Sequence, residues 1–136
     1  MIVVVDYGVN NLKSVVRALA AGGHEARLTI DPDEVRRFDT SLPVPHVGWA
    51  RVDPTAAGAG HPVVAAVFHG TPQYFYHVHS YHPAGLPEED VLATGTYERV
   101  FPTVVGRGNV LGAQFHPEKS QRAGIELLDA FARWRP

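Results

Sequence analysis

The chain has 136 residues, of which 45% are hydrophobic and 19% charged, and its formal net charge is -2 with no cysteine. This length and balance predict one globular domain with its own core, neither disordered nor membrane-embedded. The weak negative charge excludes an electrostatic basis for binding nucleic acid or an anionic membrane, and the missing cysteines exclude disulfides and cysteine-ligated zinc.

Residues 2–5 form a short apolar run without a basic leader, and no later apolar run approaches the roughly 18 residues of a membrane span. The expected location is therefore the cytoplasm.

The first third of the chain follows a β-α rhythm. Residues 1–5 are β-branched and apolar, which predicts a buried strand. From Asn11 the apolar positions follow helical spacing up to the glycines at 22 and 23, and residues 26–30 alternate as a second strand. Asp31 and Pro32 then predict the start of a helix over 32–37. The pattern is typical of an α/β sheet with helices on both faces.

That rhythm ends at the proline-rich connector 40–45, and an antiparallel meander of short strands is predicted after it. The predicted strands are 47–52, 63–68, 73–79, 91–97, 103–105 and 110–115. Ser120 is expected to cap a final helix that turns Leu127, Leu128 and Phe131 inward.

Residues 114–120, Gln-Phe-His-Pro-Glu-Lys-Ser, place His116 and Glu118 on either side of a rigid proline. A carboxylate that orients an imidazole makes the ring a better proton acceptor, as in nucleophilic enzymes. The alternative is a surface turn that ends a strand and has no catalytic role.

The longer run 114–120 resembles the closing motif of class I glutamine amidotransferases. Three further segments, 6–15, 45–49 and 74–81, follow in family order and resemble the glutaminase subunit of imidazole glycerol phosphate synthase. The resemblance covers residues 1 to about 38 and 43 to 136. It implies a flavodoxin-like α/β fold.

The resemblance also implies a reaction shared between two proteins in histidine biosynthesis. The glutaminase hydrolyses glutamine through a cysteine thioester, and the ammonia passes to a (βα)8-barrel cyclase in a heterodimer, with no metal or other cofactor. By this resemblance His116 is the general base, Glu118 its orienting carboxylate, and Ser80 and Tyr81 bind glutamine. Trp49, Lys119 and Asn11 face the cyclase.

The chain departs from the family in one major respect. Between its second helix and its Pro-His-x-Gly-Trp motif the family carries a glycine-rich oxyanion loop and a Gly-x-Cys-x-Gly elbow, and both are missing here. We therefore expect a single amidotransferase domain over 1–136 with a gap near 38–43, without its central β-α units and inactive as a glutaminase. Ser41 and Ser80 are poor replacements because neither lies in an elbow sequence.

Three alternatives remain open at this point. The chain could be a non-catalytic protein that binds the cyclase, or the product of a damaged gene. It could also be a metal-binding module, because His77 and His79 share one face of a predicted strand and His82 follows closely.

Overall fold

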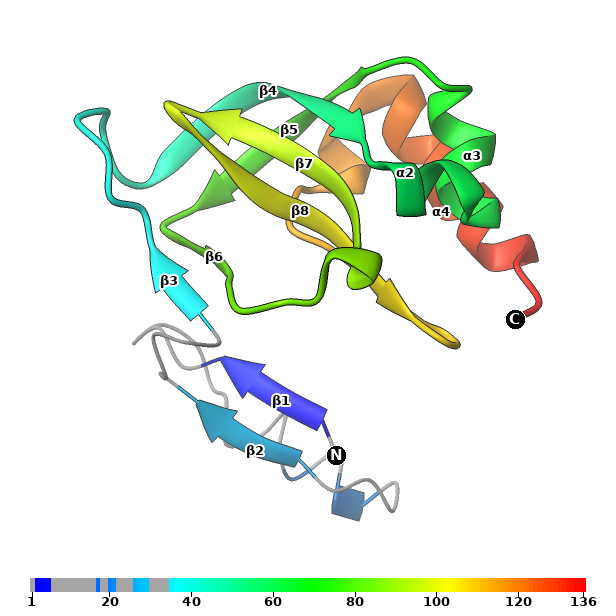
Figure 1. The fold of residues 1–136 in the computed structure, drawn as a ribbon, viewed down its shortest axis with the longest axis horizontal. Coiled ribbons are helices and arrows are strands. Elements are labelled where there is room, and N and C mark those ends of the chain that lie inside the picture. Colours follow the sequence, from blue (N-terminus) through cyan, green and yellow to red (C-terminus); the bar gives the residue numbers. More distant parts are fainter. Residues whose placement is uncertain (1, 6–16, 18–19, 22–25, 30–34) are drawn as a thin grey trace.

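The computed structural model describes residues 2–5, 17, 20–21, 26–29 and 35–136 (Figure 1). Helices pack against a mainly antiparallel five-stranded sheet, and two further pairs of strands accompany it. The predicted α/β class, with antiparallel strands in the C-terminal half, is confirmed.

The two predicted N-terminal strands are present. β1 (Ile2–Val5) and β2 (Ala26–Thr29) pair in parallel, with Ile2 opposite Ala26. The helix expected between them, together with Asn11, lies almost wholly outside the described residues.

The five-stranded sheet has the order β5-β4-β7-β8-β9 and forms the centre of the structure. Its neighbouring strands are all antiparallel, which confirms the predicted meander. The strands are β4 (His46–Pro54), β5 (Gln73–His79), β7 (Val91–Tyr97), β8 (Arg99–Arg107) and β9 (Val110–Ala113).

The strand predicted over 63–68 is wrong, because this segment is a helix. After the short α2 (Ala56–Gly60), α3 (Pro62–Phe68) begins with proline in its first turn, where the missing N–H costs nothing. Its valines favour strands by propensity, but Val64 and Phe68 are one helical turn apart and both are fully buried. Burial of one helical face overrides the local preference.

The helix predicted over 32–37 is also wrong where the structure describes it. β3 (Val35–Arg37) pairs antiparallel with β6 (Tyr81–Pro83), and Arg37 lies opposite Tyr81. The backbone N–H of Phe38 donates to the carbonyl of Ser80 at 3.1 Å and continues this ladder. A long-range partner and the burial of Phe38 therefore override the helix-start signal in the sequence.

α4 (Gln121–Arg133) confirms the final helix, which follows a 3₁₀ turn (Pro117–Lys119). Leu127 is buried as expected, but Leu128 and Phe131 remain 48% and 47% exposed. The expectation that all three face inward is therefore wrong for two of them. A second 3₁₀ turn (Glu88–Asp90) precedes β7.

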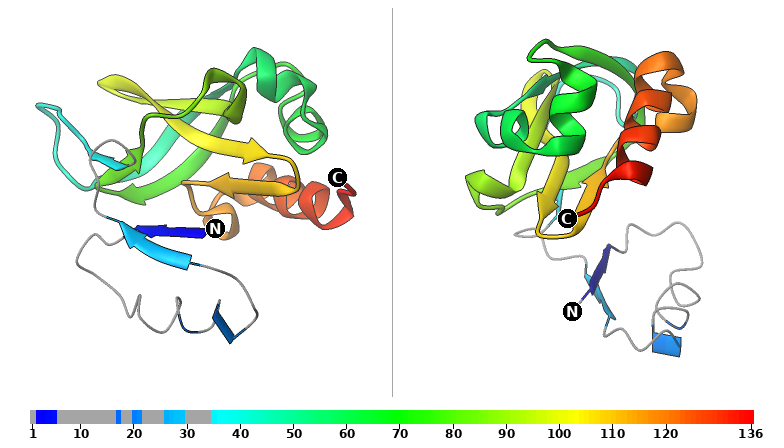
Figure 2. Two further views of the ribbon diagram at one scale, coloured as in Figure 1. Left: turned by 60° about the horizontal axis from the view of Figure 1, so that its bottom comes forward. Right: turned by 90° about the vertical axis from the view of Figure 1, so that its right-hand side faces the viewer.

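The core lies between the sheet and the helices α3 and α4, which Figure 2 shows side by side at one end of the sheet. Phe75 of β5 stacks on Phe115 with ring centroids 3.9 Å apart, and Phe68 of α3 packs against Phe75. These rings join the sheet, α3 and the segment that leads into α4.

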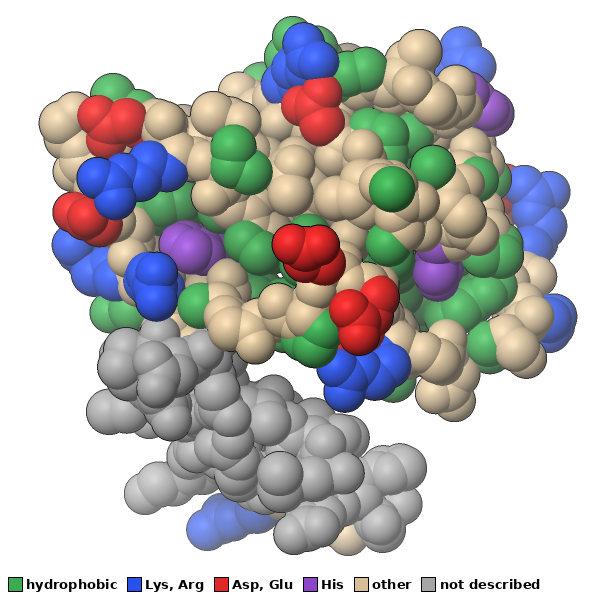
Figure 3. Space-filling model, viewed as in Figure 1, with side chains coloured by type: hydrophobic (Ala, Val, Ile, Leu, Met, Phe, Trp, Pro, Cys, Tyr) green, Lys and Arg blue, Asp and Glu red, His purple; other side chains and the backbone are tan. Residues whose placement is uncertain are grey.

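Among the described residues, none of the helices is long and apolar enough to cross a membrane. On the face shown in Figure 3, basic and acidic side chains of the described residues are interspersed and do not gather into a patch of one sign.

Gly124 sets the distance between α4 and the turn before it. A Cβ atom at this position would lie 1.8 Å from the carbonyl oxygen of Pro117, far inside van der Waals contact with backbone. Glycine is therefore required inside this helix, although it lowers helix propensity there.

We expect Gly124→Ala to destabilise the fold by about 2 kcal/mol, because α4 must move away from the turn at Pro117. The matched control is Gly60→Ala in α2, where a Cβ would meet nothing within 4 Å. Urea unfolding of both variants measures the difference. Equal midpoints for the two variants would contradict the close packing.

Candidate functional site

His116 and Glu118 form a hydrogen-bonded pair on the surface. The Nδ1 atom of His116 lies 2.8 Å from Oε1 of Glu118. The pKa of the Glu118 carboxyl is held below its usual range, first by its own backbone N–H and then by the His116 ring. An ionised Glu118 accepts a hydrogen bond from a protonated Nδ1 of His116. The neutral ring then carries its lone pair on Nε2, which is the atom that a general base requires.

Three hydrogen bonds fix the backbone of His116 to β5. Its N–H donates to the carbonyl of Tyr76 at 2.9 Å, and the Ser120 hydroxyl donates to the His116 carbonyl at 2.6 Å. The N–H of Tyr76 donates in turn to the Ser120 hydroxyl at 3.0 Å. Ser120 therefore stands before α4 as predicted, but its side chain joins the turn to the sheet and does not cap the helix.

Trp49 lies on β4, next to Tyr76 of β5. It lies opposite Tyr76 in the strand register, and the two rings meet edge to face with centroids 6.1 Å apart. Trp49 is 47% exposed, and Val47 and Val78 beside it are also exposed. Lys119 is exposed in the turn that carries Glu118. Val47, Trp49 and Val78 therefore form an exposed apolar strip on β4 and β5.

Ser80 lies just beyond the end of β5. It is four residues beyond Tyr76, a distance of about 13 Å along an extended strand. Tyr81 begins β6 next to it, and both side chains are half-buried. The structure brings His116 and Glu118 together, and it places Trp49 against Tyr76, whose carbonyl accepts from the His116 N–H. Asn11 lies outside the described residues.

His46, His77 and His79 form a buried cluster. The sequence analysis grouped His77 and His79 but missed His46. Nδ1 of His46 lies 3.1 Å from Nε2 of His79, and Nε2 of His77 lies 2.9 Å from the Thr103 hydroxyl. His46 also stacks on Tyr97 with centroids 4.0 Å apart. Alternation along β5 places two of these rings on one face, but the third comes from β4, a pairing that the sequence does not specify.

Burial keeps these imidazoles neutral. Desolvation is the main cause that lowers the pKa of His77 to about 3 and that of His79 to about 4. Both ring nitrogens of His77 already have partners, the Phe75 carbonyl and Thr103. Within the described part of the chain no group of three His, Cys, Asp or Glu side chains could hold a metal ion. This geometry does not favour the metal-binding alternative.

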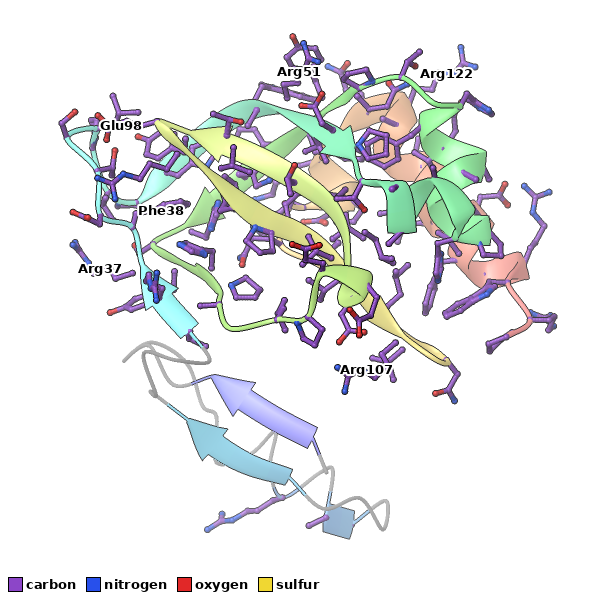
Figure 4. All side chains as sticks on the ribbon, viewed as in Figure 1. Arg37, Phe38, Arg51, Glu98, Arg107 and Arg122 are labelled. Carbon is purple, nitrogen blue, oxygen red and sulfur yellow. The ribbon has the colours of Figure 1, made fainter. Side chains whose placement is uncertain are left out.

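The connector after β3 is also tied to the sheet. Glu98, at the turn between β7 and β8, accepts hydrogen bonds from the Ser41 hydroxyl at 2.6 Å and the Ser41 N–H at 2.8 Å (Figure 4). The Tyr97 hydroxyl donates to the Pro43 carbonyl at 2.6 Å. Residues 38–43 are therefore part of the same body as the sheet.

Solved structures share this fold, and two of them illustrate it. One is the glutaminase domain of Trypanosoma brucei CTPS with bound acivicin, at a TM-score of 0.53 and 17% identity, covering 75% of this chain and 47% of that chain. The other is a putative GMP synthase subunit from Thermoplasma acidophilum, at a TM-score of 0.55 and 14% identity, covering 96% of this chain and 90% of that chain. The fold is that of the class I glutamine amidotransferases.

Curated relatives narrow the class, although no family model matches the chain. The chain is 47% identical over 118 residues to the imidazole glycerol phosphate synthase subunit HisH of Salinibacter ruber, covering 82% of this chain and 51% of that protein. It is 42% identical over 112 residues to the HisH subunit of Symbiobacterium thermophilum, covering 82% of this chain and 50% of that protein. The chain belongs to the HisH family and spans about half the length of the relatives it matches.

The histidine cluster predicts acid sensitivity. Because the pKa values of His77 and His79 are lowered in the folded state, the unfolded chain binds more protons below pH 6.5. The free energy of unfolding should therefore fall as the pH drops from about 6.5 towards 4, by roughly 2 kcal/mol per buried imidazole.

His77→Phe should reduce this dependence without abolishing it, because a phenyl ring of similar size binds no proton while His79 remains. Replacing His69, which is exposed, with asparagine is the matched control, because it removes an imidazole from the surface and not from the cluster. Urea unfolding between pH 4 and 8 gives the slope for each variant, and parallel slopes for wild type and His77→Phe would exclude this origin.

Proposed function

We propose that the chain derives from the glutamine amidotransferase subunit of imidazole glycerol phosphate synthase and retains the proton-transfer half of its glutaminase site. The observation that carries the proposal is the hydrogen bond between His116 and Glu118. Hydrogen bonds to Tyr76, one of them through Ser120, attach this segment to β5. In this role His116 is the general base and Glu118 orients it, while Ser80 and Tyr81 bind glutamine. The family reaction produces glutamate and ammonia in the cytoplasm and needs no cofactor.

The chain alone is proposed to be inactive as a glutaminase. It contains no cysteine, and its two candidate serines do not fit the task of a nucleophile. The Ser41 hydroxyl is hydrogen-bonded to Glu98, and neither Ser41 nor Ser80 lies in a Gly-x-Ser-x-Gly turn. A serine would also need a stronger base and an oxyanion site to become reactive.

We propose one amidotransferase domain whose missing family segment lies before residue 25, and not near 38–43. The match to the Symbiobacterium relative extends over 112 residues, which is 82% of the 136 residues here, so it has no room for a long gap. Any stretch of 112 residues in this chain includes 25–112.

The partner proposed for this chain is the cyclase subunit, which receives the ammonia in the family reaction. The apolar strip of Val47, Trp49 and Val78 is exposed on β4 and β5, and Lys119 is exposed in the turn that carries Glu118. Exposed aromatic residues of this kind dominate the energy of many interfaces. This strip, with Asn11, is the proposed contact, and it favours the second candidate function, a non-catalytic protein that binds the cyclase.

Ammonia release from glutamine should stay at the blank level for the pure chain, with or without the cyclase of Salinibacter ruber. A coupled glutamate dehydrogenase assay measures it, with His116→Ala as control. Turnover above the blank that His116→Ala abolishes would show that another nucleophile serves the base.

Trp49→Ala should weaken binding to the same cyclase at least about tenfold, because it removes a half-exposed aromatic anchor. Val100→Ala is the matched control, since Val100 is 68% exposed on β8, away from β4 in the sheet order. Isothermal titration calorimetry measures both dissociation constants. Equal values for the two variants would remove the strip from the interface.

A further inference from the structure

Helix α4 carries three distinct stripes along its surface. One is charged and solvated, because Arg122 pairs with Glu126 at 2.7 Å and Arg133 pairs with Asp129, each four residues apart. Such pairs mark the face that a helix turns to water.

The second stripe packs against the body. Gly124 and Leu127 are buried, and Ala123, Ala130 and Trp134 pack on the core beside them. This stripe joins α4 to the hydrophobic core.

The third stripe is apolar and open. Ile125, Leu128 and Phe131 are 66%, 48% and 47% exposed, and they lie between the charged and the buried stripes. With about 100° between successive residues, Leu128 points well away from its buried neighbour Leu127. In the right-hand view of Figure 2, α4 lies at the margin of the body, with α3 on one side and no described element on the other.

An apolar arc this wide is typical of a helix packed between two layers. In α/β folds such helices cover a parallel sheet, and here the described body covers one side of α4 only. The relatives carry about half of their length outside the match, so they have residues that could form the second layer.

We propose that the open stripe of α4, defined by Ile125, Leu128 and Phe131, is a docking site for the polypeptide segment that HisH relatives carry outside the match. The inference rests on the proposed function, because that segment is also where the family's cysteine elbow would come from. Docking would bring a thiol to the His116–Glu118 pair and complete the site from two pieces.

A second copy of this chain fits the stripe less well. Three side chains of these sizes and exposures offer roughly 300 Å², whereas a stable dimer buries about 800 Å² per partner. A segment that forms a whole layer would contact this stripe and more of the body at once.

The test is coexpression of the chain with the unmatched segment of the Salinibacter ruber relative, tagged for purification. We expect a complex with one copy of each. Leu128→Asp should weaken it at least tenfold, because the change buries a charge, whereas Arg122→Asp on the charged stripe should leave it unchanged. Both positions are exposed, and circular dichroism of the free variants checks that they fold.

The outcomes separate the docking site from the proposed chemistry. A complex that Leu128→Asp disrupts supports docking whether or not it hydrolyses glutamine. If that complex lacks glutaminase activity, the proposed role of His116 is wrong while the docking site stands. Absence of the complex, insensitivity to Leu128→Asp, or a homodimer of this chain that the same change disrupts would overturn the docking site.

Discussion

The seam between β5 and the segment that leads into α4 supports the rest of this structure. Phe75 stacks on Phe115, the backbone of Tyr76 bonds to that of His116, and the Ser120 hydroxyl links the two. Because α4 starts immediately after Ser120, the seam fixes the helix, its packing on α3 and the position of the His116–Glu118 pair together. Structure and candidate chemistry therefore share one set of contacts.

Elements that carry a simple period were predictable from the sequence. β4, β5 and β7 alternate or contain aromatic and β-branched residues, and α4 has a clear helical spacing. α3 was missed because its valines suggest a strand and its period is visible over two turns only. β3 was missed because its partner β6 is more than 40 residues away in the chain.

In the candidate site, too, local geometry was predictable from the sequence and long-range pairing was not. His116 and Glu118 are two residues apart around Pro117, so local geometry was enough to predict their contact. The joining role of Ser120 and the cluster of His46, His77 and His79 depend on which strands become neighbours. Helical periodicity also could not show that Leu128 and Phe131 are exposed while Leu127 is buried, since all three belong to one wide apolar arc.

The uncovered side of α4 bears on the lifetime of the chain in a cell. Aliphatic and aromatic groups left open to water attract chaperones, and proteases remove copies that stay unprotected. Shielding of the exposed Ile125, Leu128 and Phe131 would remove that target from a copy of the chain. The amount of the chain in a cell would then follow the amount of the polypeptide that covers α4, because degradation would remove the uncovered excess.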